Sequence, residues 1–127
     1  MTSKIFVKTI TKDYRGVFAG SPIKKGEVIE ISPVVVFPAK DTKALDKTGV
    51  FDYYFLWGKH NQAAIALGTG SLYNHSYLPN AEYEQDVKKK VITFTALRNI
   101  KKGEEITVNY NGDWDDLSPI WFKVTRP

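Results

Sequence analysis

Asn74-His75-Ser76-Tyr77-Leu78-Pro79-Asn80-Ala81 is a polar stretch that lies between two more apolar runs of the chain. It places several hydrogen-bonding side chains and a proline in a segment that is too short for a stable helix. About thirty positions later, Gly103-Glu104-Glu105-Ile106-Thr107-Val108-Asn109-Tyr110 has the pattern of a turn, then a short strand, that ends on a tyrosine. These two stretches decide the prediction of the fold.

The composition of the chain is that of an ordinary globular domain. Its 127 residues fit one domain, and a chain of this length buries a core without disulfides or metals. Hydrophobic residues make up 43% and charged residues 25%, and no apolar run is long enough to cross a membrane. The start, Met1 to Lys8, lacks the apolar region of a signal peptide. We therefore expect a single domain over residues 1–127 and an intracellular protein.

Two further properties exclude classes of function. The sequence contains no cysteine, which rules out a disulfide framework and a thiolate zinc site, so we expect no metal. The net charge is +4, and the basic clusters Lys24-Lys25, Lys88-Lys89-Lys90 and Lys101-Lys102 each lie beside a turn or a strand end. This dispersed arrangement favours solubilising charge at loop tips, and we do not expect direct binding of nucleic acid.

The pattern along the chain predicts many short strands broken by turn residues. Pro33 to Phe37, closed by Pro38, has the pattern of a strand at a sheet edge. Asp41 to Asp46 is predicted to form one helical turn capped by Asp41. The other expected strands are Ile5 to Thr9, Gly16 to Ala19, Val28 to Ile31, Ala81 to Glu84, Lys90 to Leu97 and the run before Tyr110.

One short motif occurs twice. Ile23 to Glu27 and Ile100 to Glu104 both read I-K-K-G-E, and apolar positions follow each copy. Their separation argues against a tandem repeat. We expect two equivalent turns that each open a strand.

The polar stretch and the run that ends on Tyr110 closely resemble the two signature motifs of the SET-domain family of protein-lysine methyltransferases. The resemblance runs from about Arg15 to Tyr110, and the repeated I-K-K-G-E turn adds to it. The most similar type is the small stand-alone SET protein of viruses and bacteria, which lacks cysteine-rich zinc modules. The resemblance implies a mostly β, β-clip-like fold of several short twisted sheets and few short helices, with a C-terminal pseudoknot.

The resemblance also implies the roles of individual residues. Tyr110 matches the catalytic tyrosine, and Tyr14 stands where the family usually has a first glycine. The residues expected to bind the cofactor S-adenosyl-L-methionine are Arg15, Gly16, Phe18, Asn74, His75, Tyr110 and Trp121. Those expected to bind the substrate are Tyr53, Val108 and Trp114. The acidic residues Asp113, Asp115 and Asp116 follow Tyr110 and are candidates for receiving a basic peptide, with a solvated loop as the alternative.

Methyl transfer from a sulfonium to an amine needs a neutral lysine, whose solution pKa is about 10.4. An apolar aromatic channel disfavours the ammonium form, and Asp52-Tyr53-Tyr54-Phe55 resembles the family's aromatic stretch beside such a channel. Val108 stands two residues before Tyr110, where the family often has an aromatic residue. Because valine is smaller and has no hydroxyl, we expect products beyond monomethyl-lysine, unless Val108 simply faces the core and Tyr53 or Trp114 narrows the channel.

The sequence therefore predicts a protein-lysine N-methyltransferase that uses S-adenosyl-L-methionine and acts on a basic protein such as a histone tail. The cellular location would be cytoplasmic, or the host nucleus for a viral or effector-like protein. The sequence leaves the oligomeric state open, with a homodimer as one alternative. Two alternatives are a non-catalytic peptide- or cofactor-binding module on the same fold and a small basic nucleic-acid-binding β domain.

Overall fold

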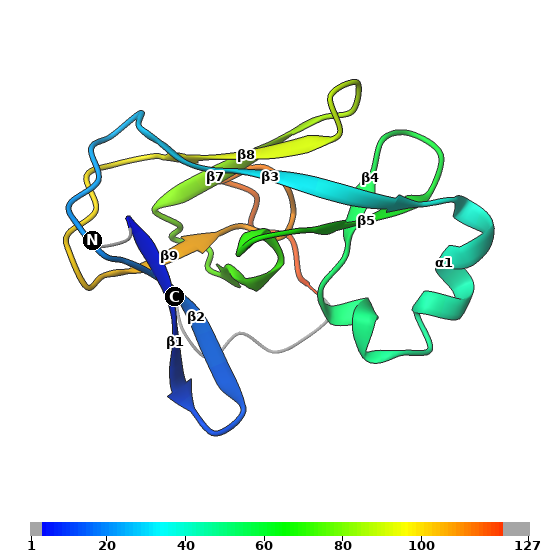
Figure 1. Cartoon of the computed structure of the whole chain (residues 1–127), viewed down its shortest axis with the longest axis horizontal. Coiled ribbons are helices and arrows are strands. Elements are labelled where there is room, and N and C mark those ends of the chain that lie inside the picture. Colours follow the sequence, from blue (N-terminus) through cyan, green and yellow to red (C-terminus); the bar gives the residue numbers. More distant parts are fainter. Residues whose placement is uncertain (1–3, 121–127) are drawn as a thin grey trace.

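The computed structural model describes residues 4–120, which form two small β-sheets and few short helices (Figure 1). The mostly β fold predicted from the sequence is confirmed. No helix of the described residues is long and apolar enough to span a membrane. In chain order the elements are β1 (Ile5–Thr11), β2 (Tyr14–Ala19), β3 (Val28–Phe37), α1 (Ala39–Leu45), the 3₁₀-helix η1 (Gly49–Asp52), β4 (Phe55–Trp57), β5 (Gln62–Ala66), η2 (Gly70–Leu72), β6 (Asn74–His75), β7 (Ala81–Asp86), β8 (Val91–Ala96) and β9 (Glu105–Val108).

The larger sheet has the strand order β4-β5-β3-β8-β7, with β3 at its centre. The expectation that Pro33 to Phe37 forms a sheet edge is wrong, because Pro33 lies inside one ten-residue strand. β3 pairs with β8 over 28–33 and with β5 over 34–37. Pro33 sits where one partner strand replaces the other, so its missing N–H interrupts neither ladder.

The smaller sheet has the order β1-β2-β9-β6. β1 and β2 form an antiparallel hairpin that projects from the body of the molecule, at the bottom of Figure 1. β9 lies between β2, to which it is antiparallel, and the two residues of β6, to which it is parallel. The two predicted motifs therefore lie side by side, although about thirty residues separate them in the chain.

The core lies between the sheets and follows the period-two alternation of the strands. Ile92, Phe94 and Ala96 of β8 point inward, as do Ile106 and Val108 of β9. The ring of Tyr73 stacks on Phe94, with 4.3 Å between the ring centroids. This packing fixes the side of β9 that faces the core and so fixes where the chain emerges at Tyr110.

The two I-K-K-G-E turns are built alike, as expected. Ile23 and Ile100 form an antiparallel bridge through two backbone hydrogen bonds of 2.9 and 2.8 Å. Gly26 and Gly103 both have positive φ, of 83° and 86°, a conformation that favours glycine. The turns open β3 and β9, so one local device starts a strand in each sheet.

The expected helical turn is present as α1, but Asp41 does not cap it. The N-cap is Pro38, which has no side-chain hydrogen bond, and Asp41 lies in the first turn, where its charge suits the helix dipole. The helix begins earlier than predicted because proline is readily accepted next to the first helical residue.

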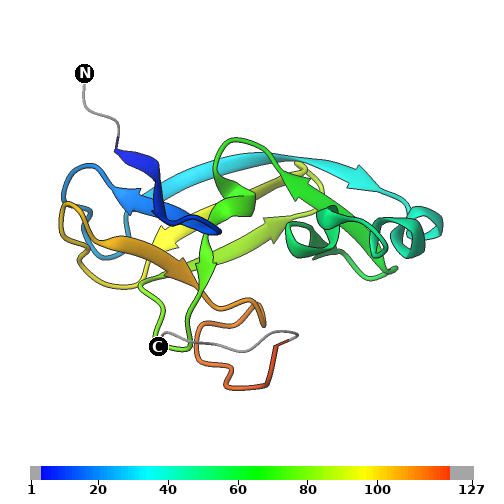
Figure 2. The ribbon, with the colours of Figure 1, turned by 90° about the horizontal axis from the view of Figure 1, so that it is seen from below.

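The chain after β9 turns back across the polar stretch, as the orange-to-red segment of Figure 2 shows. The Tyr77 hydroxyl donates to the Ser118 carbonyl at 3.0 Å, and Asn109 Nδ2 donates to the Asp116 carbonyl at 2.6 Å. This return brings the C-terminal part of the chain next to the 74–80 segment, as a pseudoknot requires. The threading itself remains a prediction.

Asn80 holds β9 with its side chain. It is 2% exposed, its Oδ1 accepts from Thr107 N at 2.9 Å, and its Nδ2 donates to Glu105 O at 2.7 Å. The amide thus continues the hydrogen bonding that β6 makes with the same strand. Asn80 is expected to be one of the more important polar residues for stability.

Replacing Asn80 with alanine leaves buried backbone groups of β9 without partners and is expected to cost about 2 kcal/mol of unfolding free energy. Urea unfolding followed by tryptophan fluorescence measures this loss. Asn99→Ala is the matched control, because Asn99 accepts one exposed hydrogen bond, from Lys25 N. Equal losses in the two variants would contradict the role given to Asn80.

Candidate active site

The 74–76 segment positions Tyr110 through backbone and ring contacts. Ser76 N donates to Val108 O at 2.9 Å, and Tyr110 N donates to the Nδ1 atom of His75 at 2.9 Å. Because Nδ1 accepts, the neutral His75 ring carries its proton on Nε2. Burial lowers the pKa of His75 from its ordinary value, which favours this neutral form. His75 therefore holds the backbone of the residue expected to be catalytic.

The hydroxyl of Tyr110 is also fixed. It donates to the backbone carbonyl of Tyr73 at 2.6 Å. Burial, and then the neighbouring acidic groups Tyr14, Tyr83 and Glu105, raise the pKa of Tyr110 well above its ordinary value. The phenol thus stays neutral at physiological pH. With its proton directed to Tyr73, its oxygen can accept hydrogen bonds but cannot serve as a strong base.

Glu30 of β3 binds the hydroxyl of Tyr73, the residue whose carbonyl accepts from Tyr110. Its carboxylate accepts from the Tyr73 hydroxyl at 2.7 Å and from the Thr69 hydroxyl and N–H at 2.5 and 3.0 Å. A Cβ at Gly68 would lie 2.6 Å from this carboxylate. These contacts fix the tyrosine whose carbonyl holds the Tyr110 hydroxyl.

An aromatic cavity of about 560 Å³ lies on one side of Tyr110. Its lining includes the buried Tyr73 and the partly buried Tyr110, and Phe55 and Tyr83 meet edge to face at 5.2 Å. Burial and the nearby Asp113 raise the pKa of Tyr83 to about 12. Among the described residues that line it, three exposed carboxylates and no cation occur. The lining consists of Phe51, Asp52, Tyr53, Tyr54, Phe55, Leu56, Gly70, Ser71, Tyr73, Tyr83, Glu84, Gln85, Tyr110, Asn111, Gly112 and Asp113.

A second, more polar cavity of about 430 Å³ lies on the other side of Tyr110. Asn74 lines it and donates through Nδ2 to Arg15 O at 2.8 Å and to Glu105 Oε2 at 2.7 Å. Both partners only accept, so they fix the orientation of the amide and leave its Oδ1 to receive a donor. The full lining is Thr9, Thr11, Lys12, Asp13, Tyr14, Arg15, Asp52, Tyr53, Ser71, Leu72, Asn74 and Tyr110.

Gly16 permits the contact between Asn74 and Glu105. A Cβ at this position would lie 2.7 Å from Asn74 Nδ2 and 2.3 Å from Glu105 Oε2. The absence of a side chain therefore lets two side chains of the protein approach β2. Gly16 was expected from the sequence to bind the cofactor, but it does not line the polar cavity and instead adjoins Asn74, which does.

Tyr110 lines both cavities, and so do Asp52, Tyr53 and Ser71. The two spaces therefore meet at a neutral, positioned hydroxyl. Such an arrangement can bring two different molecules together at one oriented group. One molecule would occupy the polar cavity, and the other would occupy the aromatic cavity with its acidic rim.

The structure brings several of the predicted residues together. Arg15, Asn74, Tyr53 and Tyr110 lie around the polar cavity, with Gly16 and His75 directly behind it. The roles predicted for them in binding and catalysis remain predictions.

Three other predicted residues lie elsewhere. Phe18 stacks on Phe6 at 6.0 Å and lies beneath Lys8, and it lines neither cavity. Val108 is 1% exposed and packs in the core, because β9 turns this position inward. Trp114 is half exposed and lines neither cavity. The structure thus gives no support to a channel wall at Val108, and the expected products beyond monomethyl-lysine remain a prediction. Trp121 lies outside the described residues.

Sequence reasoning missed several contributors. Tyr73 acts through its carbonyl, and Glu30 acts through Tyr73; neither role has a sequence signal beyond the position of Tyr73 directly before Asn74. Of the acidic cluster only Asp113 lines the aromatic cavity, whereas the Asp116 carboxylate accepts from Ser118 N within its own loop. Asp52 and Glu84 supply the other two carboxylates of the rim, and Tyr14 lines the polar cavity.

Comparisons with known proteins concern the chain as a whole. Residues 14–111 match the model of the SET domain. The chain is 34% identical over 122 residues to the histone-lysine N-methyltransferase, H3 lysine-37 specific, of Schizosaccharomyces pombe, covering 95% of this chain and 78% of that protein.

Two solved structures are similar as well. A Plasmodium falciparum protein assigned as a histone methyltransferase has a TM-score of 0.69 and 33% identity, with 87% of this chain and 100% of that chain covered. A humanized mutant of the Chaetomium thermophilum Polycomb Repressive Complex 2, bound to the inhibitor GSK126, has a TM-score of 0.70 and 19% identity. It covers 87% of this chain and 15% of that chain, and at this identity the likeness concerns the fold alone.

The fold and the match over most of the chain define a class of protein: the chain belongs to the SET domain family. It is a protein-lysine N-methyltransferase, and enzymes of this family use S-adenosyl-L-methionine as the methyl donor.

His75 makes the stability of the fold depend on pH. Its folded-state pKa lies below the ordinary value of 6.5, so below pH 6.5 the unfolded chain gains a proton that the folded chain does not. Stability is therefore complete above about pH 6.5 and falls as the pH is lowered. Urea unfolding at pH 7.5, 6.5 and 5.5 measures the decline.

His75→Asn is the matched variant for this experiment, because an amide oxygen can accept from Tyr110 N without titrating in this range. The stability of the variant should change less between pH 7.5 and 5.5 than that of the wild type. The same decline in both proteins would show that His75 is not the group responsible.

Proposed function

We propose that this chain transfers methyl groups from S-adenosyl-L-methionine to a lysine of a basic protein tail, with a histone H3 tail as the first candidate. The cofactor occupies the polar cavity, and the lysine enters through the aromatic cavity. The observation that carries the proposal is that Tyr110, whose hydroxyl is held on the Tyr73 carbonyl, lines both cavities. The histone substrate rests on the names of relatives that are about one-third identical in sequence.

The lining of the polar cavity suits the proposed cofactor. The Oδ1 of Asn74 can accept from an ammonium, and Arg15 and Lys12 can contact a carboxylate. The hydroxyls of Thr9, Thr11 and Ser71 can pair with the polar edges of a nucleoside. S-adenosyl-L-methionine carries these groups and would supply an electrophilic methyl on a sulfonium. The residues present therefore fit it.

The aromatic cavity suits a lysine side chain in two stages. Asp52, Glu84 and Asp113 are exposed and attract a cation to the entrance. Further in, Tyr73, Tyr83 and Tyr110 replace water by aromatic surface, which disfavours the ammonium and lowers the pKa of an entering lysine. The amine thus reaches the end of the cavity more readily deprotonated than in water.

Tyr110 orients the amine. Its proton is directed to the Tyr73 carbonyl, so its oxygen presents lone pairs to an N–H of the incoming amine. The phenol with its raised pKa does not take up the lysine proton, which leaves to water before transfer. Catalysis then depends on alignment of the two reacting groups rather than on proton transfer to the protein.

Tyr110→Phe tests this function. The variant loses one hydroxyl and little volume, so it should fold, while methyl transfer should fall by roughly 10²-fold or more because the amine loses its alignment. Incorporation of labelled methyl into recombinant histone H3 and into H3-tail peptides provides the measurement, with cofactor binding followed by calorimetry.

Tyr77→Phe is the control, since it removes a hydroxyl that bonds Ser118 O outside both cavities. A folded Tyr110→Phe protein with near wild-type turnover would refute the catalytic assignment. A wild-type protein that binds the cofactor but modifies no lysine in histones or in a lysate would favour the alternative of a non-catalytic module.

Asp113→Asn tests the acidic rim. The substitution should raise KM for a basic peptide by about two- to fivefold at low salt and leave kcat unchanged, because an exposed charge contributes little and acts before the chemical step. The difference should shrink at high salt.

Asp115→Asn is the matched control, since this exposed residue lines neither cavity. Steady-state kinetics over a salt series gives both results. Identical KM values for the two variants would remove Asp113 from the substrate path.

A histone substrate would place the protein in a nucleus, whereas the location expected from the sequence was cytoplasmic, or the host nucleus for a viral or effector-like protein. Fluorescence microscopy of the tagged chain tests this location. The homodimer stays a prediction that light scattering can check.

A further inference from the structure

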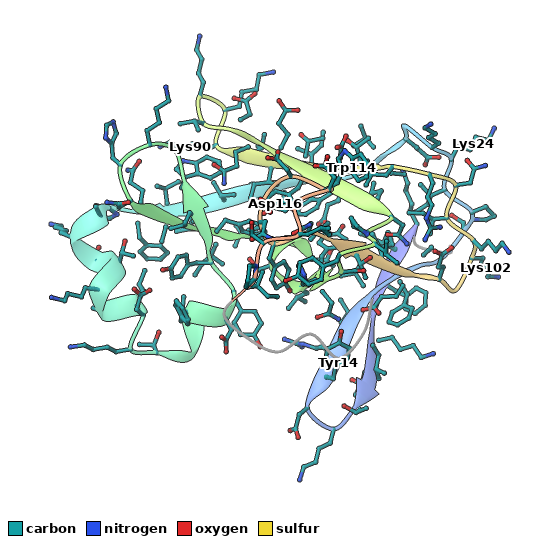
Figure 3. The ribbon with its side chains drawn as sticks, turned by 180° about the vertical axis from the view of Figure 1, so that it is seen from behind. Tyr14, Lys24, Lys90, Lys102, Trp114 and Asp116 are labelled. Atoms are coloured by element: carbon teal, nitrogen blue, oxygen red, sulfur yellow. The ribbon has the colours of Figure 1, made fainter. Side chains whose placement is uncertain are left out.

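The two I-K-K-G-E turns bring four lysines to one end of the molecule. Ile23 and Ile100 are bonded to each other through their backbones, so the lysine pairs that follow them lie on adjacent turns. Figure 1 shows both turns at its left, opposite α1, and Figure 3 labels Lys24 and Lys102 at one end of the molecule, away from Lys90. We call Lys24, Lys25, Lys101 and Lys102 the basic end.

The carboxylates of these turns are already engaged with other cations. Glu27 pairs with Lys4 at 2.6 Å and accepts from Lys24 N. Glu104 pairs with Arg98 at 2.9 Å and accepts from Lys101 N. Among residues 4–120 none of the four lysines of the basic end forms a salt bridge, and all four are exposed.

The net charge of this end accounts for the net charge of the chain. The basic end, with Lys4 and Arg98, contributes six cations against the two carboxylates Glu27 and Glu104, a local net charge of +4. This equals the formal net charge of the whole chain, so the remaining residues are balanced. A charge distribution of this kind is not needed for solubility alone, which a uniform surface would also provide.

The two turns that carry the basic end are also preorganised. Each turn is closed by a backbone hydrogen bond, from Glu27 N to Lys24 O at 2.9 Å and from Glu104 N to Lys101 O at 3.0 Å. Each is tied to a second strand, through Gly26 N to Ala96 O and Gly103 N to Ala19 O. The four ammonium groups therefore extend from fixed backbone positions, which lowers the entropic cost of presenting them together.

We propose that the basic end binds the phosphate backbone of a nucleic-acid duplex without reading its sequence. A duplex carries about one negative charge per 1.7 Å of its axis, so an array of ammonium groups releases several counterions on contact. Neither turn, over residues 21–27 and 98–104, contains an aromatic residue on which unpaired bases could stack. The chemistry therefore favours the duplex backbone over a single strand.

This site is separate from the methyltransferase site and goes beyond the proposed function. None of the four lysines lines either cavity. In the sequence each lysine pair looks like an isolated loop tip. The bridge between Ile23 and Ile100 joins the two pairs into one surface. A protein tail in the aromatic cavity and a duplex on the basic end could therefore be bound at the same time.

The test is fluorescence anisotropy with a labelled 30-base-pair duplex of arbitrary sequence, titrated with the full chain over a salt series. Four phosphate contacts predict a slope of about −3.6 in log affinity against log salt, a loss of about 150-fold between 50 and 200 mM salt. The variant K24Q/K25Q/K101Q/K102Q should lose most of this affinity and most of the slope.

The matched control is K40Q/K43Q/K47Q/K59Q, which removes four exposed lysines outside the basic end, from α1 and the loops near it. It should keep the slope, although its net charge changes by the same amount. Circular dichroism and S-adenosyl-L-methionine binding verify that both variants fold.

Four results would overturn the proposal: no duplex binding by the wild type, equal losses in the two variants, tighter binding of a single strand than of the duplex, or binding of phosphatidylserine vesicles without binding of the duplex. Activity on a free peptide should be unchanged in K24Q/K25Q/K101Q/K102Q, so a failure of the methyltransferase assignment would not mask the result.

Discussion

The hydrogen bonding of the 74–80 segment to β9 is the constraint on which the site depends. β6 pairs in parallel with Thr107 and Val108, and the Asn80 side chain pairs with the backbone of the same strand. The His75 ring then receives the N–H of Tyr110. A buried strand needs partners along both edges, and β2 supplies only one of them. The polar stretch completes the other edge, so the groups that satisfy β9 also set where the tyrosine emerges.

Around that point the molecule separates two electrostatic requirements of amine methylation. The entrance of the aromatic cavity must attract a cation, whereas its end must favour a neutral amine. Under the proposed function, exposed carboxylates such as Glu84 and Asp113 perform the first task, and the buried ring of Tyr73 and the partly buried ring of Tyr110 perform the second. In this proposal, the change of environment along one cavity replaces a titrating base. The Tyr73 carbonyl completes the arrangement by directing the phenol of Tyr110, which burial keeps neutral.

Most strands could be predicted from the sequence because their alternation is regular, as in β8. The length of β3 could not, since Pro33 ends a strand unless the partner changes at that residue. In the site, the resemblance of the two motifs to the SET-domain family was what assigned Tyr110 and Asn74 to one site. The support from Tyr73 could not be predicted, because it comes from a backbone carbonyl that any residue possesses. The inward direction of Val108 required the register of β9, which only its pairing defines.

The exchange of partners within β3 divides the molecule into parts that can evolve separately. The chain from 38 to 67 holds α1, η1, β4 and β5, and its only strand pairing with the rest of the large sheet is through the last four residues of β3. This segment supplies the outer wall of the aromatic cavity, including Tyr53 and Phe55, yet contributes nothing to the hold on β9. Insertions or replacements within it can thus reshape the entrance for new substrates while Tyr110 keeps its hold on Tyr73 and His75. Asp52 and Tyr53, which also line the polar cavity, are the positions of the segment where such changes would reach the second site.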